Sequence, residues 1–138
     1  MNDGTRLTSP LLRAGLWFLT FVEFAVGLVA TLAPWAFYDL VPWVNLMPPY
    51  SEHLMRDYGA MNLSLALVFV VAATTMELRM VRIALGAYLL FAIPHLIFHV
   101  AHLEKFTTAA AVGQTTALTL ALLLPVALLI LTRQRRSN

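Results

Sequence analysis

The sequence contains no cysteine, which excludes thiol redox chemistry, disulfide bonds and metal sites built from thiolates. Charged residues are also scarce: they make up 12% of the 138 residues, whereas soluble domains carry about a quarter. Glycine-rich phosphate loops, nucleophile elbows and internal repeats are missing as well. The chain therefore offers no support for the common nucleotide-dependent enzymes or serine hydrolases.

Apolar residues dominate the composition of the chain. They account for 60% of the chain, the mean hydropathy is +0.78, and they form runs long enough to cross a bilayer core of about 30 Å. The pattern predicts an integral membrane protein in the lipid bilayer. Its net charge of +2 is assigned to basic loops, so we expect no nucleic-acid partner.

Four apolar runs predict four spanning helices. Barrel strands would alternate apolar and polar residues, and these runs do not, so the expected fold class is an all-α membrane four-helix bundle. The first run is too long for the apolar part of a signal peptide, and we expect it to be retained. The bundle forms one domain, residues 1–138, with spans at roughly 11–32, 53–75, 80–102 and 107–131.

The basic residues predict the orientation of the bundle. All but two of the nine lie before the first span, at the turn near residue 79 or after the last span; the exceptions are Arg56 and Lys105. Because Lys and Arg are retained in the cytoplasm, both termini should be cytoplasmic. The expected location is the bacterial inner (plasma) membrane.

The loop at residues 33–52 should lie at the outer interface. Trp and Tyr favour the headgroup level, and prolines at positions 34, 42, 48 and 49 interrupt any long helix. Two interpretations stay open here: a membrane-anchored connector, or short turns that cover the mouth of the bundle.

Ionisable residues cluster toward this outer side. At about 100° per residue, His95, His99 and His102 share one face of the third span. Ionisable groups are costly in a bilayer, so their clustering suggests a functional site. We expect a single outer pocket for a ligand or partner, formed by Glu23, His53, Arg56, Asp57, His95, His99 and His102.

The chemistry of this pocket stays open at the level of sequence, and no catalytic residue is assigned. His95, His99 and His102 are candidate metal ligands. His53 with His95 or His99 could hold haem iron axially, and a quinone is a third option. A His-Glu-x-x-His signature is missing. A purely structural alternative is an internal network in which Arg56 pairs with Asp57 or Glu23.

Small residues should let the helices approach closely. The glycines expected to serve this packing role are Gly27, Gly59, Gly86 and Gly113.

The four spans and the opening Arg13-Ala14-Gly15-Leu16-Trp17-Phe18, which leads to Gly27, resemble the DoxX-like group of small bacterial membrane proteins. The Glu52-His53-x-x-Arg56-Asp57 element and the three-histidine face resemble small actinobacterial four-helix proteins. The DoxX-like resemblance implies a subunit associated with membrane oxidoreductase complexes, and it assigns no catalytic residue.

The expected function is that of a small accessory or regulatory subunit of a larger membrane complex, such as a transporter or an oxidoreductase, with other integral membrane subunits as partners. An enzyme is not the favoured interpretation. The alternative is a stand-alone redox protein that binds a metal, haem or quinone in the histidine pocket. A carrier or sensor for a lipid or quinone would use the same pocket.

Overall fold

The computed structural model describes residues 6–46 and 49–134, which form helices joined by short loops. Four helices are long and apolar enough to cross a membrane, and their bounds lie within a few residues of the four runs expected from the sequence. A short helix and a 3-10 turn lie in the loop after the first span. The elements are α1 (Pro10–Leu32), α2 (Pro34–Leu40), η1 (Val44–Leu46), α3 (Glu52–Thr75), α4 (Leu78–Ala101) and α5 (Thr108–Gln134).

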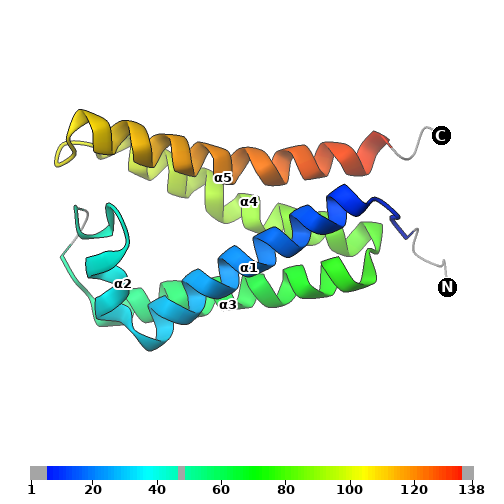
Figure 1. Ribbon diagram of the computed structural model, residues 1–138, viewed down its shortest axis with the longest axis horizontal. Helices are drawn as coiled ribbons and strands as arrows, with labels where there is room; N and C mark the ends of the chain where they lie inside the picture. The colour runs from blue at the N-terminus through cyan, green and yellow to red at the C-terminus, as the bar shows by residue number, and fades with distance from the viewer. Residues whose placement is uncertain (1–5, 47–48, 135–138) are drawn as a thin grey trace.

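The long helices form two antiparallel pairs (Figure 1). Helix α1 packs along α3, and α4 packs along α5. The α3–α4 contact joins the two pairs, while α1 and α5 meet over a smaller area. The start of α1 and the end of α5 lie at the same end of the bundle, whereas α2 and η1 lie at the opposite end (Figure 1). We call these the basic end and the loop end.

Two glycines set the close approach of α1 and α3. A Cβ built at Gly27 would lie 2.8 Å from the backbone nitrogen of Leu63 and 2.9 Å from the carbonyl oxygen of Gly59. A Cβ at Gly59 would meet the carbonyl oxygen of Gly27 at 2.9 Å. The packing role predicted for these two glycines is therefore confirmed.

The same prediction was wrong for Gly86. A Cβ at this position would meet nothing within 4 Å, because Gly86 lies where no neighbouring helix approaches. Gly15, which was not among the glycines expected to serve packing, has a packing role instead: a Cβ there would lie 2.7 Å from the side chain of Leu128 on α5.

Hydrogen bonds join the chain segments at the basic end. The backbone N–H of Leu7 donates to the carbonyl of Met76 at 2.8 Å, which ties the N-terminal segment to the α3–α4 turn. Arg82 on α4 donates through Nε to Thr132 Oγ1 on α5 at 3.2 Å. The buried apolar core fills this half of the bundle, and it includes Leu12, Leu16, Phe69, Ala72, Met76, Val81, Ala84, Leu85 and Leu128.

Candidate functional site

A cavity of about 650 Å³ lies at the loop end, where the two helix pairs diverge. Its walls come from α1, α3, α4, α5 and the segment that contains α2 and η1. The buried apolar core lies mostly toward the basic end, where a further depression of about 640 Å³ lies between the N-terminal segment and the end of α3. Most of the wall is apolar, supplied by residues such as Val26, Val29 and Leu118.

Aromatic rings line one side of this cavity. The ring of Tyr58 on α3 stacks on that of His95 on α4, with centroids 6.4 Å apart and planes at 20°. The ring centroid of Phe37 on α2 lies 5.8 Å from that of Tyr58. The ring of His99, one turn beyond His95, meets it edge-on at 4.4 Å. These rings form a wall suited to a flat molecule.

Two polar side chains contribute unsatisfied atoms to the cavity wall. Gln114 on α5 is only 4% exposed, yet its Oε1 has no hydrogen-bond partner, and neither has Nδ1 of the half-buried His99. The two side chains lie within electrostatic range of each other. A buried polar atom without a partner costs about 1–3 kcal/mol. The arrangement therefore favours a molecule that brings a hydroxyl group to these atoms.

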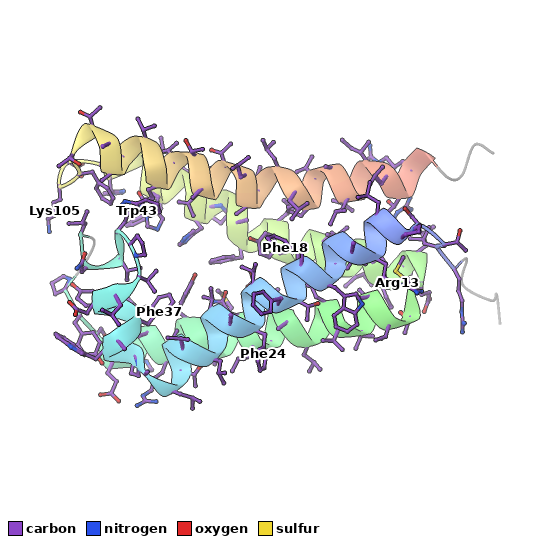
Figure 2. All side chains as sticks on the ribbon, in the orientation of Figure 1. Arg13, Phe18, Phe24, Phe37, Trp43 and Lys105 are labelled. Atoms are coloured by element: carbon purple, nitrogen blue, oxygen red, sulfur yellow. The ribbon has the colours of Figure 1, made fainter. Side chains whose placement is uncertain are left out.

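The described part of the loop, residues 33–46 and 49–52, lines this cavity. Val41, Pro42 and Trp43 contribute to the wall. Trp43 has a left-handed backbone with φ of 72°, which is uncommon for a bulky residue and costs about 1–3 kcal/mol. Its indole packs on Gly113, where a Cβ would lie 3.0 Å from Trp43 Cζ2. Figure 2 shows Trp43 between the loop and α5. This geometry corresponds to the covering interpretation of the loop.

An aromatic cluster holds α2 against the segment that leads into α3. Trp35 and Tyr50 meet edge-on with ring centroids 4.8 Å apart, and Tyr38 lies 5.4 Å from Tyr50. These amphipathic rings suit the headgroup level of a bilayer. The cluster fixes the base of the covering loop while Trp43 reaches across to α5.

The polar residues at the start of α3 lie outside the cavity. The side chain of His53 is 88% exposed and its Nε2 is 3.2 Å from Asp57 Oδ2. Arg56 pairs with Glu52 at 2.8 Å and donates to the carbonyl of Thr31, near the end of α1. A cation at this position stabilises a helix C-terminus. The single seven-residue pocket expected from the sequence is therefore not assembled, because these side chains point along the exposed surface of α3.

His102 also lies apart from His95 and His99. It is exposed, its Nδ1 is 2.8 Å from the carbonyl oxygen of Phe98, and its ring stacks on that of Phe98 at 4.2 Å. The reason is that α4 ends at Ala101, so His102 leaves the helical face that the other two share. Over residues 6–46 and 49–134, no three histidine or acidic side chains are placed to hold a metal ion. His53 does not face the cavity either, so the proposed axial haem pair lacks one member.

Glu23 is buried beside the cavity and does not line it. The side chain is 3% exposed and its Oε2 has no hydrogen-bond partner. The proposed partner Arg56 is engaged with Glu52 and Thr31 instead. Tyr58 and Tyr88 lie within electrostatic range of the carboxyl group. Glu23 thus belongs to a polar region beneath the aromatic wall.

The wall residues that were not among the site residues expected from the sequence include Tyr58, Trp43 and Gln114. A signal existed for Gln114, since it is an amide in an otherwise apolar span and such residues tend to bond across helices. Tyr58 and Trp43 resemble the ordinary aromatic residues of a membrane interface. Their place in the wall depends on how the loop folds back over the bundle.

Comparison of the chain with protein-family models, with curated proteins and with solved structures gives no match. The functional argument therefore rests on the geometry of the cavity.

Proposed function

We propose that the protein binds a small, membrane-dissolved molecule with a hydroxylated aromatic ring, such as a hydroquinone, in the cavity at the loop end. The observation that carries this proposal is the pair of buried, unpartnered atoms Gln114 Oε1 and His99 Nδ1 on the wall of a largely apolar cavity. A ring hydroxyl would donate to Gln114 Oε1. The stacked Tyr58 and His95 rings would contact the face of the bound ring.

This proposal corresponds to the quinone alternative raised by the sequence, and it needs no metal. Binding pockets for small molecules are mostly apolar with a few convergent polar groups, and their volumes are about 300–1,000 Å³. The cavity of about 650 Å³ falls in this range. Its cover by the Trp43 loop would limit exchange of the bound molecule with water.

Replacing Gln114 by Leu should weaken binding and leave the protein at least as stable. The variant loses one hydrogen bond to the ligand, so affinity should fall about three- to tenfold. It also removes a buried acceptor that is unsatisfied without ligand, so the unliganded melting temperature should stay equal or rise. The measurement is the thermal shift produced by 2-methyl-1,4-naphthohydroquinone, kept reduced under anaerobic conditions, on protein in nanodiscs.

Thr116→Val is the matched control, because Thr116 is an exposed residue of the same helix and does not line the cavity. This variant should bind the hydroquinone as wild type does. A wild-type protein that shows no shift with the hydroquinone would refute the proposal. A Gln114→Leu variant with unchanged affinity would exclude Gln114 from the binding site.

A role as accessory or regulatory subunit of a transporter or oxidoreductase complex is a second proposal. It is favoured by α5, which packs mainly on α4 and leaves apolar side chains such as Val112, Leu120 and Leu123 exposed. Neighbouring membrane subunits could cover this face as well as lipid does. Purification from native membranes in mild detergent should then recover a larger membrane complex, whereas a homogeneous small particle would contradict this role.

We also propose that the protein lies in the inner membrane with both termini in the cytoplasm. The arginines of the described helix ends support this orientation, since Arg13, Arg82 and Arg133 share the basic end and Arg56 lies at the loop end. Because the chain has no cysteine, single-cysteine variants can be labelled without background.

Asn45→Cys, in the covering loop, should react with a membrane-impermeant maleimide in intact spheroplasts. Ser137→Cys, which lies outside the described residues, should react only after the membrane is permeabilised. Labelling of both variants from the same side would contradict the topology.

A further inference from the structure

The depression at the basic end carries two arginines on its wall. It encloses about 640 Å³ between the N-terminal segment, the start of α1 and the end of α3. Arg6 and Arg13 border it, together with Trp17 and with Thr8 and Ser9, which carry hydroxyl groups. We call it the arginine depression. Figure 2 shows Arg13 at the basic end, far from the cavity at the loop end, so the two sites are independent of each other.

The charges of these two arginines are not neutralised within the part of the chain that the structure describes. The ion pairs formed among residues 6–46 and 49–134 both lie at the loop end. Glu77 faces Arg6 across an isolated backbone bridge, but their side chains form no ion pair in these ranges. Two guanidinium groups on the wall of one depression attract an anion.

Trp17 extends the arginine depression toward the middle of the membrane. It follows Arg13 by one helical turn, which is about 6 Å along the axis of α1, and it is 43% exposed. Helix α1 starts at the basic end and is long enough to span a bilayer. Tryptophan favours the boundary between headgroups and hydrocarbon. A molecule that contacts both Arg13 and Trp17 therefore needs an anionic group and an apolar part.

We infer that the arginine depression binds the phosphate of an anionic phospholipid, with the first part of its acyl chains against Trp17. A guanidinium group presents a planar fork of N–H donors that matches two phosphate oxygens. Basic pockets at the ends of spanning helices suit anionic lipid headgroups. A free phosphate ion would make the same contacts with Arg6 and Arg13, but it has no apolar part to lie against Trp17.

The test compares lipids that share their acyl chains and differ in headgroup charge. Purified protein in mild detergent is titrated with phosphatidylglycerol or with phosphatidylcholine, and native mass spectrometry measures the fraction that carries a lipid. We expect wild type to bind phosphatidylglycerol at least about fivefold more tightly, the factor that one basic side chain contributes near anionic lipid. Arg13→Gln and Arg6→Gln should each lower the affinity for phosphatidylglycerol about fivefold for the same reason. Neither should change the affinity for phosphatidylcholine.

Arg79→Gln is the matched control, because Arg79 is an exposed arginine at the same end of the bundle and does not line the depression. It removes the same charge and should leave the affinity for phosphatidylglycerol unchanged. If it cost as much as Arg13→Gln, the basic end would attract lipid as a whole and the site would be refuted. Equal binding of the two lipids by wild type would refute it too. Inorganic phosphate that displaced phosphatidylglycerol at equal concentration would identify a site for a free anion and overturn the lipid assignment.

Fluorescence quenching then locates the bound lipid. The chain has three tryptophans, so Trp35→Phe with Trp43→Phe leaves Trp17 as the only one. In bilayers, phosphatidylglycerol with brominated acyl chains should quench Trp17 more strongly than brominated phosphatidylcholine at the same mole fraction. Arg13→Gln should remove this difference, whereas Arg79→Gln should preserve it. Equal quenching by the two lipids in the protein with both arginines would place the bound lipid elsewhere and contradict the inference.

Discussion

A leucine at Gly59 is expected to abolish folding of the bundle. Gly59 lies against the α1 backbone, where an added Cβ would be 2.9 Å from the carbonyl oxygen of Gly27 and would also collide with Thr31. Main-chain atoms cannot rotate away as a flexible side chain can, so the two helices would have to separate. Overpacking a well-packed core typically costs about 1–3 kcal/mol, and we expect Gly59→Ala to lie in that range. Gly59→Leu, with three more carbons, should yield no monodisperse protein in detergent.

Gly86→Ala is the matched control, because a Cβ at that position meets nothing within 4 Å. It should leave the melting temperature unchanged or raise it, since alanine is favoured over glycine in a helix by about 0.8–1 kcal/mol. Size-exclusion profiles and thermal unfolding of a fluorescent fusion protein measure all three variants. If Gly59→Leu and Gly86→Ala melted alike, the close packing of α1 on α3 would be refuted.

The contrast between these two glycines illustrates what the sequence can predict. The length and hydropathy of the apolar runs were sufficient to predict the four long helices, because a bilayer imposes both requirements on any spanning helix. A glycine in an apolar run gives no indication of which neighbour it faces. Gly15 and Gly86 have similar surroundings in the sequence, yet only Gly15 is packed against another helix.

The candidate site was predictable in part, for a related reason. Helical periodicity places His95 and His99 on one face, and both line the cavity. The same periodicity fails for His102 because α4 ends before it. The prediction for His53, Arg56 and Asp57 depended on the depth of these residues along the span. The depth of a residue does not show in which direction its side chain points around the helix. The i, i+4 pairs His53–Asp57 and Arg56–Glu52 keep these side chains on the exposed surface of α3.

Glu23 is where burial and charge conflict most directly. It lies on the buried face of α1, together with Thr20 and Gly27, and no hydrogen-bond partner is present for Oε2 among the residues that the structure describes. A charged side chain at the centre of a spanning helix costs about 2.5–3.5 kcal/mol even on the lenient insertion scale. This is a large share of the 5–15 kcal/mol that stabilise a typical domain. This cost suggests that the carboxyl oxygens of Glu23 have a role near Tyr58 and Tyr88.

Substitutions of Glu23 should therefore separate its charge from its polarity. Glu23→Gln keeps hydrogen-bonding capacity and removes the charge, so thermal stability should be equal to or higher than that of wild type. Glu23→Lys places a longer cation in the same buried position and should lower the yield of folded protein severely. Glu23→Leu should be less stable than Glu23→Gln, because the side chain faces α3 and a polar region, whereas Phe24→Leu on the exposed face of α1 should be neutral. Thermal unfolding in one detergent ranks the four variants. If Glu23→Leu and Phe24→Leu proved equally harmless, the carboxyl group would face lipid and have no part in the polar region beneath the cavity.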